Sequence, residues 1–217
     1  MTPSRFLLTK NWLYFLFFSL WVLFVGYCVF FISKETSFLV INHHRSLFLD
    51  IFGTAATCIG DGSFTIILAF LLFFLKKRKL SYLLFISYVV SGIIAQIMKH
   101  LHPMARPVAW FNHAQKVYTA SWSHLHSMGS FPSGHATSVF SAATILAIYC
   151  KKPIWAILCF VVACCTAWSR VYLGQHFVED IWYGSILGTA TAVTCYFLYN
   201  YILSAKKNHI LPHSKHA

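Results

Sequence analysis

The chain has 217 residues, a length typical of one domain, so we expect no separate soluble domain. Only 10% of the residues are charged and 58% are hydrophobic, whereas soluble domains carry about 25% charged residues. This composition excludes an ordinary water-soluble protein. The net charge of +12 does not indicate nucleic-acid binding, because the basic residues cluster between apolar runs, as they do in membrane proteins.

Six apolar stretches predict an all-α integral membrane bundle of about six transmembrane helices. They cover roughly residues 12–32, 63–75, 80–101, 135–150, 153–168 and 177–203. A helix needs about 20 residues to cross the hydrocarbon layer. The second, fourth and fifth stretches are shorter, and we expect flanking semi-polar residues or a thinned bilayer to complete them. The first stretch lacks a small-residue cleavage site, so we expect it to remain as an anchor.

The basic residues divide unevenly between the two sides of this predicted bundle. One side would hold eleven of them: Arg5, Lys10, residues 76–79, Lys151, Lys152, Lys206, Lys207 and Lys215. The other would hold six: Lys34, Arg45, Lys99, Arg106, Lys116 and Arg170. Because cytoplasmic loops are rich in Lys and Arg, we predict cytoplasmic termini in an inner (cytoplasmic) membrane.

The opposite, outer or periplasmic side would carry two longer segments, residues 33–59 and 102–130. The first segment has the pattern of an amphipathic helix lying on the membrane surface. Its apolar residues are Leu47, Phe48, Ile51 and Phe52.

Neither the cysteines nor the histidine pairs indicate a metal site. Six of the seven cysteines lie in or at the ends of apolar runs, and only Cys58 lies in an outer segment, so no disulfide framework or zinc spacing is present. Three histidine pairs lack an acidic or thiol partner nearby and belong more naturally to a polar outer loop. These pairs are His43 with His44, His100 with His102, and His124 with His126. We therefore expect no metal and no cofactor.

Three short patterns at the ends of apolar runs carry the unusual residues. The first is Lys99 followed, six residues later, by Arg106 and Pro107. The second is the run from Pro132 through Ser133 and Gly134 to His135. The third is Ser169, Arg170, His176 and Asp180. All would lie near the outer surface, and ionisable residues at membrane depth point to function.

The cations of these patterns are suited to binding phosphate. Lys99, Arg106 and Arg170 would repel one another unless an anion lay between them, and the arginine fork matches phosphate oxygens. Ser133 and Gly134 precede an apolar helix, whose free N–H groups would point at the same anion. Gly134, without a side chain, would let the backbone approach closely.

The histidines add a nucleophile and a proton donor. A spacing of four residues places His176 and Asp180 on one face of a helix. The carboxylate would fix the imidazole tautomer and leave the other nitrogen free to attack phosphorus. His135 would protonate the leaving oxygen. Together these residues form a phosphoryl-transfer site that requires no metal.

The three patterns resemble the signature of the type 2 phosphatidic acid phosphatase superfamily, K-x6-RP, PSGH and SR-x5-H-x3-D. Every signature position is present between residues 99 and 180. The resemblance implies a phosphohistidine on His176, oriented by Asp180 and later hydrolysed by water, with His135 as acid and then base. It also implies phosphate binding by Lys99, Arg106, Ser133, Gly134 and Arg170.

On this basis, residues 1–217 are expected to form a single membrane-embedded phosphatase domain. Its substrate would be a lipid phosphate monoester or diphosphate: phosphatidic acid, phosphatidylglycerol phosphate, undecaprenyl diphosphate or lipid A. Nothing in the sequence selects among these lipids or indicates an oligomeric state. Two other functions remain open, a lipid-to-lipid phosphotransferase and a catalytically silent membrane or transport protein.

Several of the residues also have purely structural interpretations. Lys99 and Arg106 could extend from a helix end toward water, and Ser133 could cap a helix. His176 and Asp180 could form a structural hydrogen bond. Asp61 is expected to cap the second crossing, and lining the active site is its alternative role. Glu179 is expected to be a first-turn charge that the helix dipole favours, and catalysis is its alternative role. Trp110, Phe111, Tyr118 and Trp122 could form an interfacial belt or a gate for the substrate headgroup.

Overall fold

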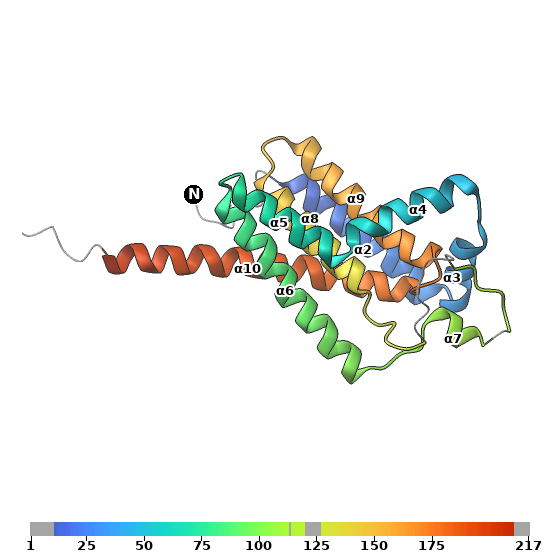
Figure 1. The fold of residues 1–217 in the computed structure, drawn as a ribbon. Helices are drawn as coiled ribbons and strands as arrows, with labels where there is room; N and C mark the ends of the chain where they lie inside the picture. Colours follow the sequence, from blue (N-terminus) through green and yellow to red (C-terminus); the bar gives the residue numbers. More distant parts are fainter. Residues whose placement is uncertain (1–10, 113, 120–126, 211–217) are drawn as a thin grey trace, which may run out of the picture.

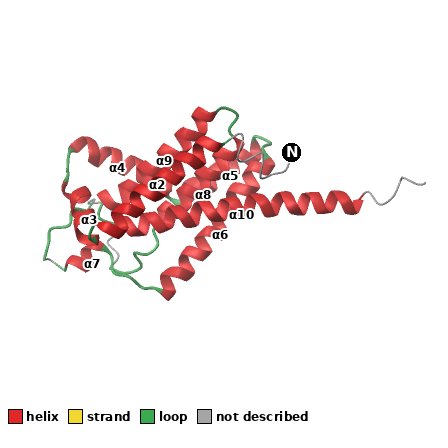
Figure 2. Cartoon of the chain, turned by 180° about the vertical axis from the view of Figure 1, so that it is seen from behind, coloured by secondary structure: helices red, strands yellow, loops and turns green. Residues whose placement is uncertain are grey.

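The computed structural model describes residues 11–112, 114–119 and 127–210, with side chains described as far as residue 206. This part of the chain is all-α, as predicted, with one isolated β-bridge between Ala105 and Met128 (Figures 1 and 2). Its helices are α2 (Trp12–Phe31), α3 (Lys34–His43), α4 (Leu47–Gly60), α5 (Gly62–Phe74), α6 (Arg78–Leu101), α7 (Pro107–Phe111), α8 (Gly134–Tyr149), α9 (Pro153–Tyr172) and α10 (Val178–Ile210).

Each of the six predicted apolar stretches corresponds to a helix, namely α2, α5, α6, α8, α9 and α10. Within the described residues, α2, α6, α9 and Val178–Lys206 of α10 are each long and apolar enough to cross a membrane. The α4–α5 pair meets the same criterion only as a span bent by 57°. The 16-residue α8 is buried along most of its length by the surrounding helices.

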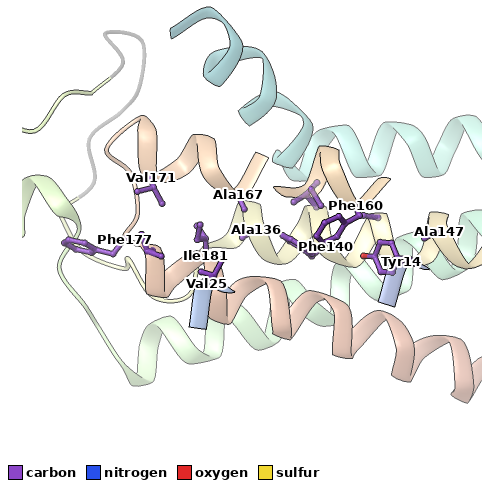
Figure 3. Close-up of a cluster of buried hydrophobic side chains, with 14 of the residues drawn as sticks. Tyr14, Val25, Ala136, Phe140, Ala147, Phe160, Ala167, Val171, Phe177 and Ile181 are labelled. Carbon is purple, nitrogen blue, oxygen red and sulfur yellow. The ribbon is translucent and has the colours of Figure 1, made fainter. Parts of the chain in front are cut away.

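A hydrophobic core runs along the bundle between α2, α8, α9 and the start of α10 (Figure 3). It extends from Tyr14 and Ala147 at one end to Val171 and Phe177 at the other. The outer surface is also apolar: Leu23 is 70% exposed and Phe74 is 77% exposed. A surface of this kind suits hydrocarbon and would be exceptional in water.

Polar and small residues join the helices inside the bundle. The hydroxyl groups of Tyr14 and Thr144 lie 2.8 Å apart, and the Trp21 indole donates to Ser185 Oγ at 3.2 Å. Gly184 and Gly188 bring the backbone of α10 close to that of α8. Small residues and interhelical hydrogen bonds of this kind hold helices together in lipid.

The connections gather at the two ends of the bundle (Figure 1). The start of α2, the α5–α6 turn and the α8–α9 turn lie at one end, whereas α3, α7 and the α9–α10 turn lie at the other. At the first end, Asn11 Nδ2 donates to the carbonyl of Ile148 at 3.2 Å, and Lys79 Nζ donates to Asn200 Oδ1 at 2.8 Å.

The expected amphipathic helix is α4, which begins after the Ser46 cap and exposes its apolar side chains. These exposed residues are Leu47, Phe48, Ile51 and Phe52. Its other face packs on α9. Because α4 continues into α5 through a sharp bend, it is also one half of the bent pair.

Candidate active site

A tight turn between α9 and α10 carries two of the predicted site residues. Gly174 adopts a left-handed φ of +71°, which glycine adopts without steric cost and which commonly ends a helix. The N–H groups of Gln175 and His176 then both donate to the carbonyl of Arg170, at 2.9 and 3.2 Å. One turn of backbone therefore fixes His176 relative to Arg170.

His176 does not share a helical face with Asp180, contrary to the expectation from their spacing. α10 begins at Val178, so His176 lies in the preceding turn and Asp180 lies in the first turn of the helix. The two still meet, because Asp180, the third residue of α10, reaches back to the residue before the helix as the acidic residue of a capping box does. His176 Nδ1 is 3.4 Å from Asp180 Oδ2, which leaves Nε2 as the nitrogen that does not face the carboxylate.

Two further groups hold the Asp180 carboxylate. Its Oδ2 accepts hydrogen bonds from the Phe177 N–H at 2.8 Å and from Ser130 Oγ at 2.5 Å. Asp180 is fully buried, and His176 is 2% exposed. The carboxylate is therefore held in place, and both side chains lie away from bulk water.

The three predicted cations lie near this pair and bind neutral groups. Arg170 Nη1 donates to Thr57 Oγ1 at 2.5 Å, Arg106 Nη1 donates to Gln175 Oε1 at 3.0 Å, and Lys99 Nζ donates to the carbonyl of Gly129 at 3.1 Å. In the described part of the chain, no carboxylate forms an ion pair with any of them, whereas Lys34 and Arg45 are paired with Glu179 and Asp50.

Arg170 has an additional donor that favours an anionic ligand. The side chain is 7% exposed, and its Nε finds no hydrogen-bond partner among the described residues. A buried guanidinium donor without a partner carries a large desolvation cost. A phosphate oxygen would supply the partner, because arginine matches this group in pairs of hydrogen bonds.

The start of α8 is fixed to the same site. Ser133 caps the helix, its Oγ accepting from the Ala136 N–H at 3.4 Å, and its own N–H donates to the carbonyl of Asp180 at 3.0 Å. A Cβ added at Gly134 would meet nothing within 4 Å, so open space lies beside this helix end. The capping prediction for Ser133 is confirmed, and it is compatible with phosphate binding here.

A cavity of about 150 Å³ lies where the α4–α5 bend, α6 and the start of α8 meet. Lys99, Gly134 and His135 line it together with Gly60 and Gly62 of the bend. A Cβ at Gly60 would be 2.5 Å from Thr166 Cγ2 and 3.1 Å from His135 Cβ, so the bend must pass close to His135. The three sequence patterns therefore converge at one end of the bundle.

A protein-family comparison matches residues 79–204 to the PAP2 superfamily. This chain belongs to the PAP2 superfamily. The resemblance inferred from the three sequence patterns is thereby confirmed. The matched segment contains all three of them, from Lys99 to Asp180.

Curated relatives of this PAP2 protein include enzymes named for lipid substrates. It is 33% identical over 121 residues to an undecaprenyl-diphosphatase of Sulfolobus acidocaldarius, a match covering 56% of each chain. It is 28% identical over 154 residues to a lipid A 1-phosphatase of Rhizobium etli, covering 63% of this chain and 65% of the relative. The chain thus spans between about half and two thirds of the length of these relatives.

Two solved structures share the PAP2 fold described here. Aquifex aeolicus LpxE superposes with a TM-score of 0.68 at 24% identity, covering 77% of this chain and 96% of that one. A transmembrane PAP2-type phosphatidylglycerolphosphate phosphatase from Bacillus subtilis gives a TM-score of 0.61 at 23% identity, covering 89% and 97%. With its long apolar helices, this PAP2 protein is a multi-pass membrane protein.

The electrostatics of the PAP2 site keep His176 neutral. Burial lowers the pKa of His176 well below its ordinary value, and the positive charges of Arg106, Arg170 and Lys99 lower it further. A neutral imidazole retains the lone pair that a nucleophile needs.

Some residues that shape the PAP2 site were not predicted. Thr57, Ser130 and Gln175 contact Arg170, Asp180 and Arg106, respectively, and all three are buried. They reach the site from α4, from the segment before α8 and from the α9–α10 turn. No local pattern marks them, because each acts through a contact that only the fold creates.

The remaining predicted features lie around the rim of the site. Asp61 caps α5 as expected, with Oδ1 accepting from the Ser63 N–H at 2.8 Å. Glu179 lies in the first turn of α10, as predicted, and pairs with Lys34. The Trp110 indole donates to Glu35 Oε1 at 3.1 Å, which holds α7 on α3. Trp122, His124 and His126 lie outside the described residues.

Three other histidines contact main-chain oxygens. His43 contacts the carbonyl of Lys116, His44 that of Val40, and His100 that of Gln96. These contacts are those of a polar, exposed rim, as the sequence suggested.

Proposed function

We propose that this chain is a lipid phosphate phosphatase that hydrolyses a phosphate monoester or diphosphate through a phosphohistidine on His176. The observation that carries the proposal is the arrangement around His176. Three largely buried cations, none of them paired with a carboxylate of the described residues, surround an imidazole whose Nδ1 faces Asp180. Such a site fits an anion that is attacked by a neutral nitrogen.

In the first step, the lipid phosphate binds among Lys99, Arg106 and Arg170, with the free N–H groups at the start of α8. Nε2 of His176 attacks phosphorus, and the bond to the lipid oxygen breaks. His135, which takes up a proton when the negatively charged phosphate binds beside it, donates this proton to the leaving oxygen, so the lipid departs as an alcohol or as the shortened phosphate. Asp180 holds the Nδ1 proton and stabilises the phosphorylated imidazole.

In the second step, water attacks the same phosphorus. His135, now neutral, takes a proton from that water, and the phosphorus–nitrogen bond breaks. Inorganic phosphate leaves, while His176 is neutral and His135 is protonated again. The three cations stabilise the charge on the equatorial oxygens in both steps, so no step requires a metal ion.

The candidate substrates remain phosphatidic acid, phosphatidylglycerol phosphate, undecaprenyl diphosphate and lipid A. The names of the relatives, an undecaprenyl-diphosphatase and a lipid A 1-phosphatase, support placing those two lipids first in a substrate panel. Transfer of phosphate from His176 to a second lipid is the alternative outcome. Tracing radiolabelled phosphate into a lipid product would reveal it.

The experiment that tests the proposal measures phosphate release by the purified full chain from each of the four lipids. His176→Ala should abolish release from every lipid that the wild type hydrolyses. His44→Ala provides a control, because this exposed histidine follows α3 and contacts the carbonyl of Val40 in that helix. Release should survive chelators and fall with orthovanadate, a mimic of the five-coordinate transition state. Substantial turnover by His176→Ala, or dependence on added Mg²⁺, would contradict the mechanism.

The proposal includes an orientation, with the site on the periplasmic side of the inner membrane and both termini in the cytoplasm. The excess of Lys and Arg at the opposite end of the bundle supports it. In a variant without native cysteines, Lys116→Cys should react with a membrane-impermeant thiol reagent added from outside. Labelling only after the membrane is broken would show that the orientation is the reverse of the one proposed.

A further inference from the structure

Asn42, at the end of α3, is a fully buried polar side chain outside the predicted site. Its amide binds main-chain groups from two distant segments. Nδ2 donates to the carbonyl of Tyr118 at 2.8 Å and to the carbonyl of Tyr172 at 2.9 Å. Oδ1 accepts from the N–H of Tyr118 at 2.9 Å. One side chain therefore joins α3, the segment 116–119 and the end of α9.

The segment held by Asn42 lies directly on the turn that carries His176. A Cβ added at Gly174 would be 2.6 Å from the carbonyl oxygen of Tyr118 and 3.1 Å from Val117 Cγ1. Gly174 is two residues before His176, and this turn also contains the carbonyl of Arg170 that binds the His176 N–H. The segment 116–119 thus covers the turn that presents the nucleophile.

Neighbours of Asn42 reinforce the same connection. His43 contacts the carbonyl of Lys116 at 2.9 Å, and Arg45 Nη1 donates to the carbonyl of Tyr172 at 3.2 Å. These two side chains are more exposed than Asn42, whose amide alone binds both segments. Asn42 is therefore the buried centre of this contact.

We propose that Asn42 is a positioning residue that fixes His176 for attack by clamping the segment 116–119 against the α9–α10 turn. Asn42 is fully buried and its amide bonds to main-chain groups of Tyr118 and Tyr172, so it acts through the turn and not by touching the substrate. The inference rests on the proposed function, in which His176 is the nucleophile. Catalytic groups must be held within about 0.5 Å of their productive positions, and a displacement of about 1 Å can lower the rate roughly 100-fold.

A matched control separates this role from general stabilisation. Asn11 is also buried, at 3% exposure, and its Nδ2 donates to the carbonyl of Ile148 at 3.2 Å. Because Asn11 lies at the opposite end of the bundle, Asn11→Ala removes one buried amide hydrogen bond without touching the turn. Asn42→Asp is a second test variant, since it preserves size and an acceptor but sets carboxylate oxygens against two carbonyls.

The kinetic test compares the purified full-length variants with one lipid that the wild type hydrolyses. Asn42→Ala should lower kcat between about 10- and 100-fold, with KM within about threefold of wild type. The kcat of Asn11→Ala should stay within about twofold of the wild-type value, even if its melting temperature falls as much as that of Asn42→Ala. Equal losses of kcat in the two variants, or a rise in KM alone for Asn42→Ala, would overturn the positioning role.

A second measurement does not depend on activity. Hydrogen exchange of the main-chain amides of Gly174, Gln175 and His176 should be faster in Asn42→Ala and Asn42→Asp than in wild type or Asn11→Ala. Faster exchange supports the clamp even if none of the four lipids is hydrolysed, an outcome that would defeat only the proposed function. Unchanged exchange in both Asn42 variants would overturn the clamp.

Discussion

Gly188 of α10 lies directly against the main-chain carbonyl of Thr137 in α8. A Cβ at position 188 would be 2.3 Å from that oxygen and 2.9 Å from the main-chain nitrogen of Ser141. One turn earlier, a Cβ at Gly184 would be 2.8 Å from the carbonyl oxygen of Ser133. Both clashes are with backbone, so no side-chain rotation relieves them. This close approach sets the separation between the helices that carry Ser133 and Asp180.

Gly188→Ala should therefore push α8 and α10 apart and lower the stability of the bundle. Overpacking of this kind costs about 1–3 kcal/mol, which thermal unfolding in detergent would detect as a lower melting temperature. Gly92→Ala is the control, because a Cβ there meets nothing within 4 Å and alanine favours a helix more than glycine does. A wild-type melting temperature for Gly188→Ala would contradict the packing described here.

Ser130→Ala should lower kcat and also lower the stability of the fold. Its hydroxyl donates to the Asp180 carboxylate at 2.5 Å, and bonds to charged groups contribute about 1.5–3 kcal/mol. If part of this energy orients Asp180 behind His176, kcat should fall roughly 10-fold. The matched control is Ser87→Ala, since Ser87 is equally buried but bonds only to the carbonyl of Leu84 within α6. Wild-type kcat in Ser130→Ala would show that this bond does not orient the carboxylate.

Stability should fall in acid partly because of His176. Burial, with Arg106 and Arg170 nearby, lowers the pKa of His176 well below the value of about 6.5 that it has in the unfolded chain. As the pH falls below about 6.5, the unfolded state therefore binds a proton that the folded state does not, and the folded state loses stability. Above that pH neither state binds the proton, and this contribution is fully present.

This contribution can be isolated with His176→Gln. Between about pH 7.5 and about pH 5, the melting temperature of the variant should fall less than that of wild type. The other histidines titrate in both proteins and cancel in the comparison. An equal fall in the two proteins would mean that His176 is protonated as readily in the folded chain as in the unfolded one.

Asp61→Asn should preserve the start of α5, whereas Asp61→Ala should weaken it. Asp61 Oδ1 accepts from both the N–H and the hydroxyl of Ser63, and asparagine is nearly as good a capping residue. The alanine variant should lose about 1 kcal/mol of stability, measured by thermal unfolding. Equal melting temperatures for the two variants would show that the Asp61 side chain does not stabilise the start of α5 as a cap.

The sequence was sufficient to predict the helices of the six apolar stretches, the amphipathic helix α4 and the convergence of the three patterns. Long apolar runs leave few alternatives in lipid, where every backbone group must bond within its own segment. The patterns lie at run ends on one predicted side, so alternating crossings bring Lys99, His135 and His176 to the same end of the bundle. The placement of these residues follows from topology alone.

The sequence was not sufficient to predict how these residues are held in place. His176 was expected on the helix with Asp180, but the left-handed Gly174 ends α9 late and delays the start of α10. The bend between α4 and α5 depends on Gly60 fitting against Thr166 and His135, a contact between distant segments. Thr57 and Asn42 bond to partners more than seventy residues away in the sequence, so no local sequence pattern predicts these contacts.

The hydrogen bonds from Gln175 and His176 to the carbonyl of Arg170 have a consequence for how a bulky lipid can be admitted. A chain that wedges helices apart changes distances between elements but leaves distances within a single turn almost unchanged. In the proposed mechanism, the Arg170 guanidinium that would bind the anion and the His176 imidazole that would attack it belong to this one short backbone unit. Their relative position would therefore change little if the surrounding helices moved apart to admit lipids of different width.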